Sequence, residues 1–144
     1  MSCLLVACRN GHIDLVDYLL EQGANPNDKD LFGGSCLMAA ACFRHPDCVR
    51  RLIYADADVE DAYPGANGSI IYMTVSCFSK DADERDLDFE EGSVIRTVEL
   101  LLEAGAPTSC SRTALQLLQD MLPLDDKVRR ERDGLIALLQ RYEE

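Results

Sequence analysis

The sequence predicts an all-α solenoid of about four stacked helix-turn-helix units, and two observations lead to this prediction. The first is an internal repeat, because a shift of 33 positions aligns residues 2–28 with residues 35–61 at ten identities, where background composition gives about two. The second is the spacing of apolar residues at i, i+3 and i+4 within each repeat, which is typical of one helix face. The identities pair Ser2, Cys3, Leu4, Ala7, His12, Asp14, Val16, Leu19, Ala24 and Asp28 with Ser35, Cys36, Leu37, Ala40, His45, Asp47, Val49, Leu52, Ala57 and Asp61.

The first unit, about residues 1–29, contains two short helices separated by Gly11 and His12. Gly23 ends the second helix, because glycine readily adopts positive φ just beyond a helix. The helices carry the apolar stripes Leu4, Ala7 and Cys8, and Ile13, Val16, Leu19 and Leu20. Little in the sequence shields the start of this unit, which fits either a natural cap or a chain from which a preceding segment has been removed.

The second unit, about residues 30–62, repeats this pattern with two departures. Arg44 stands where the first unit has Gly11, and Asp56 stands where it has Gly23. Non-glycine residues at these turns predict a strained or differently capped unit.

The third unit, about residues 63–108, begins its first helix at Ile70, which aligns with Leu37. Val16 and Val98 are 82 positions apart, 16 more than two repeats of 33. An insert therefore separates the two helices of this unit, within residues 79–92. Residues 80–91 contain seven acidic and two basic residues, so the insert is acidic.

The fourth unit, about residues 109–144, completes a single domain of residues 1–144. Its first helix begins at Arg112, and Asp125 precedes a long second helix from Asp126 to Arg141. A long, charged last helix fits a terminal cap, which needs a polar outer face.

Composition limits the partners of this domain. The chain has 26 acidic and 14 basic residues, a formal net charge of −12. Such a surface repels phosphate backbones, so we expect no direct binding of nucleic acid and a protein or peptide partner with a basic segment. No apolar stretch approaches 18 residues, so we expect no membrane contact.

Residues 5–27 resemble an ankyrin repeat, whose period is 33 residues. The family pattern is T-P-L-H-x-A-A, then G-H, then V-x-x-L-L-x-x-G-A-x-x-N, and Ser2-Cys3-Leu4-Leu5 replaces its beginning. The resemblance implies a concave groove lined by first helices and loop tips that binds a protein or peptide. It also implies that His12 and His45 tie the loops together rather than bind a metal.

Residues that the core does not need are the candidates for partner contact. Leu31 and Phe32 stand at a loop tip, and Phe43 takes a variable position that faces the groove in the family pattern. Tyr63 and Asn67 stand on a Pro/Gly turn. The alternatives are that Phe32 folds back over the neighbouring unit and that Asn67 is only a turn residue. Arg9 and Asn10 occupy the matching region of the first unit, and Val75 and Ser76 occupy that of the third.

The insert supplies the remaining candidates, whose carboxylates would receive Lys or Arg side chains around an apolar contact. They are Asp81, Asp83, Glu84, Asp86, Asp88 and Phe89. If they share a face with the acidic cluster of residues 56–61, a basic peptide such as a histone tail would fit. The alternative is a solvated loop with no specific role.

The sequence offers no catalytic, cofactor or metal motif. Counted from Asp81, the sixth and twelfth positions hold Asp86 and Gly92, whereas an EF-hand needs Gly and Glu there. There is no zinc spacing, phosphate loop or nucleophile elbow. We therefore expect no enzyme and no cofactor.

Seven cysteines lie in apolar helical patterns, and no signal peptide is visible. We interpret the cysteines as reduced core residues of an intracellular protein, in the cytoplasm or nucleus, either monomeric or part of a larger chain. The predicted function is protein binding. The alternative is a regulatory module that blocks an enzyme such as a kinase; a receptor with the insert as a lid and an architectural spacer are further possibilities.

Overall fold

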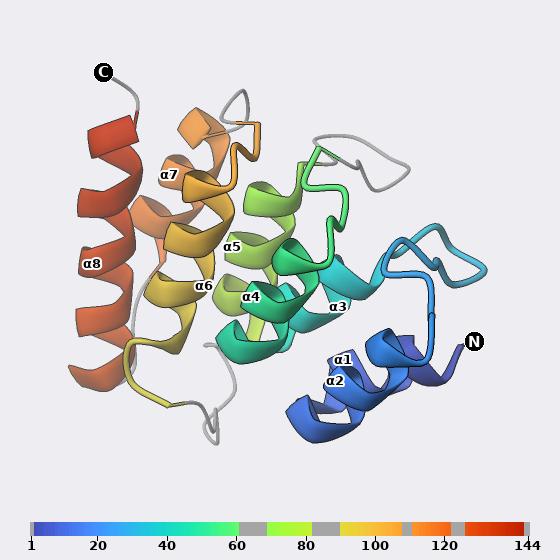
Figure 1. Cartoon of the computed structure of the whole chain (residues 1–144). Helices are drawn as coiled ribbons and strands as arrows, with labels where there is room; N and C mark the ends of the chain where they lie inside the picture. Colours follow the sequence, from blue (N-terminus) through green and yellow to red (C-terminus); the bar gives the residue numbers. More distant parts are fainter. Residues whose placement is uncertain (1, 61–68, 82–89, 108–110, 122–125, 143–144) are drawn as a thin grey trace.

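The computed structural model describes residues 2–60, 69–81, 90–107, 111–121 and 126–142, and these residues form eight helices (Figure 1). Within these ranges there is no strand, and the only β-type pairing is a bridge between Lys29 and Ser35. The helices are α1 (Cys3–Asn10), α2 (Ile13–Glu21), α3 (Cys36–Cys42), α4 (Pro46–Tyr54), α5 (Ile70–Asp81), α6 (Ser93–Glu103), α7 (Ser111–Asp120) and α8 (Asp126–Tyr142).

The helices stack as pairs in two layers. Each first helix packs on its own second helix, as α1 does on α2 and α7 does on α8. The first helices α1, α3, α5 and α7 also contact one another in succession, and so do the second helices α2, α4, α6 and α8 (Figure 1). A fold in which each unit contacts only its neighbours is a solenoid, so the predicted all-α solenoid is confirmed.

Serine caps the first helix of the first three units. The hydroxyl oxygens of Ser2, Ser35 and Ser69 each accept a hydrogen bond from the main-chain N–H three residues further on, at 3.2, 3.1 and 3.2 Å. Each cap satisfies one of the N–H groups that a helix leaves free at its start.

These caps show that the register of the third unit differs by one residue from the sequence alignment. Ser69 follows Ser35 by 34 positions, not 33. Ile70 therefore corresponds to Cys36 and not to Leu37, and both Ile70 and Cys36 are buried at the start of their helices. The sequence comparison missed the shift because this part of the third unit has diverged.

One continuous apolar core runs through all four pairs of described helices. Its largest fully buried side chains include Leu4, Leu37, Leu52, Ile71, Phe78, Leu101, Leu118, Leu135 and Leu139. Cys8, Cys36 and Cys48 belong to this core, whereas Cys3 is exposed. Burial raises the pKa of Cys48 to about 11, so this side chain stays a thiol at neutral pH.

The two non-glycine turns of the second unit adopt left-handed backbone. Arg44 has φ of 64° and Asp56 has φ of 65°, close to the φ of 72° at Gly11. The main-chain hydrogen bonds of the turn are kept, as in the 3.1 Å bond from Asp56 N–H to the carbonyl of Ile53. Non-glycine residues disfavour this conformation, so the positive φ values agree with the strained alternative of the sequence prediction.

A carboxylate from α8 caps α6. Gly92 precedes α6 and supplies no side-chain cap, and Glu131, which is 1% exposed, takes that role. Its two oxygens accept hydrogen bonds from the N–H groups of Gly92 at 2.7 Å, Val94 at 2.9 Å and Ile95 at 3.1 Å. The negative charge also lies at the positive end of the α6 dipole, which stabilises it there.

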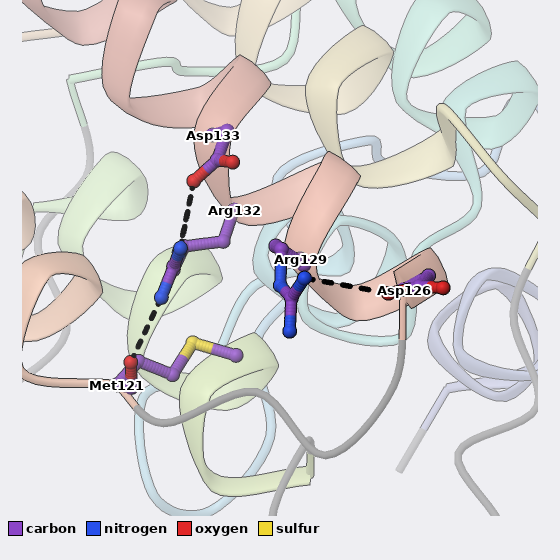
Figure 2. Close-up of polar contacts among 5 residues, drawn as sticks. All are labelled: Met121, Asp126, Arg129, Arg132 and Asp133. Carbon is purple, nitrogen blue, oxygen red and sulfur yellow. Dashed lines mark hydrogen bonds and ion pairs between the residues drawn. The ribbon is translucent and has the colours of Figure 1, made fainter.

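Helix α8 lies close against α6 and is tied to the end of α7. A Cβ at Gly134 would meet Cδ1 of Ile95 on α6, so the two helices lie close together at this glycine. Figure 2 shows the guanidinium of Arg132 between the carboxylate of Asp133, at 2.9 Å, and the main-chain oxygen of Met121, at 3.1 Å. These contacts fix the last helix pair at the end of the stack.

Candidate partner-binding groove

The loop between α2 and α3 forms a hydrogen-bonded hairpin over residues 29–35. Asp30 organises it, because its Oδ1 accepts hydrogen bonds from the N–H groups of Phe32 and Gly34, each at 2.8 Å. Asp30 N–H in turn donates to the carbonyl of Gly34 at 2.9 Å. Leu31 and Phe32 form the tip, and they are 98% and 75% exposed.

The exposure of Phe32 decides between the two interpretations of its sequence position. A ring folded back over the neighbouring unit would lose most of its accessible surface, and this ring does not. The hairpin therefore presents two large apolar side chains to solvent on a hydrogen-bonded backbone. Single exposed apolar residues are common on protein surfaces. Two of them together at a hydrogen-bonded tip, one aromatic, make the tip a candidate site of partner contact.

Beside this hairpin, α1, α3 and α5 line a shallow apolar groove of about 260 Å³. Its lining includes Leu5, Arg9, Met38, Cys42, Phe43 and Met73. The methionines are flexible and polarizable, so this surface can adapt to different apolar side chains.

Arg9 and Phe43 form one wall of the groove. The guanidinium carbon of Arg9 lies 5.0 Å from the centre of the Phe43 ring, a cation–π contact. Phe43 is 43% exposed, so part of the ring still faces solvent. This contact connects the first and second units beside the groove.

The main chain of Arg9 is held as well. His45 Nε2 lies 3.0 Å from the carbonyl oxygen of Arg9 and donates to it as the Nε2–H tautomer. Burial lowers the pKa of His45 below its usual 6.5. The predicted structural role of His45 is thereby confirmed, whereas His12, at the equivalent position, is exposed.

A hydrogen bond to a side chain also connects the loop after α2 with the loop after α4. Asn27 Oδ1 accepts a hydrogen bond from Asp58 N–H at 2.7 Å. Asp58 in turn accepts from Glu60 N–H at 2.9 Å. Asp56, Asp58 and Glu60 are all exposed, so the described part of the second loop carries a negative surface.

Of the described candidates, Phe43 lines the groove, and Leu31 and Phe32 lie at the tip of the hairpin whose residues Asp30 and Gly34 also line it. Asp81 is the last residue of α5. The remaining candidates lie outside the described residues: Tyr63, Asn67, Asp83, Glu84, Asp86, Asp88 and Phe89.

For the groove position of the third unit, the sequence interpretation is corrected. Val75 is fully buried, and Met73 lines the groove in its place. The reason is the one-residue shift in register, which pairs Val75 with buried Ala41 and Met73 with Ala39. The alignment of serine caps is the signal that would have identified Met73.

Residues 1–63 match the family model described as ankyrin repeats in three copies. Residues 1–63 therefore carry ankyrin repeats. Among solved structures, the ankyrin repeat domain of human ASB11 aligns with the whole of this chain at a TM-score of 0.71 and 18% identity. This chain spans 55% of the length of that one, and no curated protein matches it.

Ankyrin repeat domains generally act as protein–protein interaction modules and not as enzymes. The apolar groove lined by α1, α3 and α5 lies on the side of the solenoid that the first helices form. Among the described residues there is no group of three or more potential metal ligands, and none of the described helices is both long and apolar enough to cross a bilayer.

Proposed function

We propose that this ankyrin domain binds a segment of a protein partner between the apolar groove and the tip of the 29–35 hairpin. The observation that carries this proposal is the exposure of Leu31 and Phe32 on a hydrogen-bonded hairpin beside the groove. The tip contacts one apolar part of the partner, and the groove accepts a second apolar side chain next to Phe43.

Burial of apolar surface supplies the affinity in this proposal. Covering a side chain such as Phe32 stabilises a complex by about 1.5–3 kcal/mol. Because Asp30 already holds the hairpin in shape, little conformational entropy is lost when the partner binds. Rigid aromatic anchors of this kind are typical centres of protein interfaces.

The partner segment has basic residues next to its apolar ones. The net charge of −12 and the exposed Asp56, Asp58 and Glu60 support this part of the proposal. We further propose that the residues of the insert, Asp81, Asp83, Glu84, Asp86, Asp88 and Phe89, contact the same partner, together with Tyr63 and Asn67 of the preceding loop.

An affinity capture experiment tests the site. The intact chain and a Phe32→Ala, Phe43→Ala double variant are immobilised in equal amounts, and captured proteins are quantified by mass spectrometry. We expect the double variant to lose its specific partners at least tenfold. Tyr54→Ala is the matched control, because Tyr54 is an aromatic residue that is 84% exposed on second-layer helix α4.

Retention of every partner by the double variant, at the level of the Tyr54→Ala control, would remove the hairpin and Phe43 from the binding site. Loss of partners by both variants would instead point to a site on the second-layer helices.

We also infer that the domain has no catalytic activity and needs no cofactor, does not bind nucleic acid directly, and acts inside the cell as a monomer or as part of a larger chain. The free buried thiols of Cys8, Cys36 and Cys48 support the intracellular assignment, because such thiols persist in a reducing compartment.

A further inference from the structure

Arg9 lines the apolar groove at the end of α1, where its side chain is exposed. Its guanidinium contacts the Phe43 ring, and it forms no hydrogen bond or ion pair with any residue that the structure describes. A guanidinium is always charged and carries five N–H donors, and a cation–π contact gives none of them an oxygen acceptor. A partner in the groove therefore meets a cation whose donors are free.

Arg51 shows how the same chain completes such a contact elsewhere. Its guanidinium carbon lies 5.8 Å from the centre of the Tyr54 ring, and its Nε donates to Oδ1 of Asp17 at 2.7 Å. Arg51 therefore has an aromatic ring and a carboxylate, whereas Arg9 has only the ring. The group that Arg9 lacks is a carboxylate, whose geometry matches the planar guanidinium.

Arg9 is also held in position without a partner. His45 Nε2 donates to the carbonyl oxygen of Arg9 at 3.0 Å, and the centre of the Phe43 ring lies 5.0 Å from the guanidinium carbon. An arginine that is already positioned loses less side-chain entropy when it binds an anion. The wall formed by Arg9 and Phe43 therefore suits an apolar side chain with a carboxylate beside it.

The opposite end of the groove is acidic. Asp30 lines the groove beside the start of α3, while Phe43 follows the end of that helix. The loop after α4, with its exposed carboxylates, is joined to the loop before the hairpin by the hydrogen bond between Asn27 and Asp58. Because α3 has seven residues, about 10 Å separates the two ends, which about three residues of extended chain would span.

The surroundings of Arg9 favour a side-chain carboxylate over the end of a chain. C-terminal carboxylates are typically bound by nests of main-chain N–H groups. Arg9 lies instead where α1 and α3 end, and the N–H groups of Gly11 and Arg44, which follow these helices, are already bonded to carbonyls of the last turns. A helix C-terminus presents carbonyl oxygens, which repel a carboxylate.

We propose that the groove selects a partner segment in which an Asp or Glu stands next to the apolar residue beside Phe43, and that its carboxylate pairs with Arg9. The basic residues of the segment lie about three positions away, at the hairpin end. The pairing rests on the proposed function, since the same groove holds the segment, and it sets the direction of charge along that segment.

Selection from a peptide library tests this pairing on the intact chain. Random peptides displayed with free C-termini are enriched on the immobilised chain, after removal of those that bind the Phe32→Ala, Phe43→Ala variant. We expect the enriched peptides to share an apolar residue next to Asp or Glu, with Lys or Arg about three positions away.

The enriched peptides are then synthesised, and their dissociation constants are measured by fluorescence polarisation. Arg9→Gln should weaken binding roughly tenfold to a hundredfold, because a charge-assisted hydrogen bond is lost. Replacing the acidic residue of the peptide by its amide should weaken binding to the original chain by a similar factor. The same replacement should have no further effect on binding to Arg9→Gln, because the two groups act as one pair.

Arg141→Gln is the matched control, because Arg141 is an exposed arginine on α8, outside the groove. It removes the same charge from the chain, and it should change the dissociation constant by less than about twofold, since salt screens distant charges. Circular dichroism of each variant checks that the helices are retained.

Four results would overturn the pairing. Binding to Arg9→Gln as tight as to the original chain would do so and would leave the proposed function standing. Effects of the two replacements that multiply when combined would place the carboxylate away from Arg9. Loss of binding when the C-terminus of the peptide is amidated would assign Arg9 to a chain end. A library without any peptide that depends on Phe32 and Phe43 would overturn the proposed function and the pairing together.

Discussion

At the scale of single residues, backbone conformation distinguishes the second unit from the first. Asp56 holds a left-handed φ of 65° at the turn where the first unit has Gly23, with φ of 89°. A side chain in this conformation is disfavoured because its Cβ approaches the following carbonyl oxygen. The turn at Asp56 therefore carries a strain that the equivalent turn of the first unit, at Gly23, does not.

Replacing this residue should stabilise the domain. We expect Asp56→Gly to raise the free energy of unfolding by about 0.5–1 kcal/mol, measured by urea denaturation. Asp56→Ala is the control, because it removes the same carboxylate but keeps the Cβ. An equal gain from both variants would show that charge, and not φ, is the cause.

His45 predicts a dependence of stability on pH. Burial holds its folded-state pKa below 6.5, so below pH 6.5 the unfolded chain binds more protons at this site than the folded chain. The contribution of His45 is fully present above pH 6.5 and is lost as the pH falls towards the folded-state pKa. We expect the free energy of unfolding to fall between pH 7 and pH 5.5.

His45→Gln should flatten this part of the pH profile, since an amide can still donate to the carbonyl of Arg9 but does not titrate. His12→Gln, at the exposed equivalent position, is the matched control for replacing a histidine by glutamine. A His45→Gln profile as steep as that of the wild type would contradict the assignment.

At the scale of elements, the start of α6 depends on a residue from another helix. Glu131 accepts three main-chain hydrogen bonds there, while the neighbouring Arg130 pairs with Glu91 at 2.6 Å on the surface. The hydrogen bond from Arg130 lowers the pKa of Glu91. The hydrogen bonds of Glu131 and the ion pair of Arg130 therefore connect the start of α6 and the residues just before it to α8.

Glu131→Gln should weaken this junction, because an amide nitrogen cannot accept a hydrogen bond and one oxygen must serve three N–H groups. We expect a loss of about 1–3 kcal/mol in the free energy of unfolding. Glu91→Gln, in the exposed pair, should have a much smaller effect. Equal effects of the two variants would show that the buried cap is not the stronger contact.

At the scale of the whole molecule, the charge of −12 acts on the encounter with a partner. If the captured partner has a basic segment, its association rate should fall severalfold between about 20 mM and 150 mM salt, because the Debye length shortens to about 8 Å. Stopped-flow or surface plasmon resonance measures this rate. A rate that does not change with salt would exclude the acidic surface as a recognition element.

The contact role of Leu31, Phe32 and Phe43 stays a prediction. The sequence by itself determined the repeat, the positions of the helices and the polar terminal unit. These could be predicted because each unit buries an apolar stripe that is local in the sequence, and each unit packs only on its neighbours.

The tertiary structure alone decided which residues meet across units. Glu131 caps a helix that begins 38 residues earlier, and Arg9 meets Phe43 and His45 in the next unit. The one-residue shift in register that brings Met73 to the groove was likewise decided only by the tertiary structure. Periodicity shows which face of a helix is buried, but the pairing of particular side chains depends on how far each helix is rotated and translated against its neighbour, which is settled only when the units pack together.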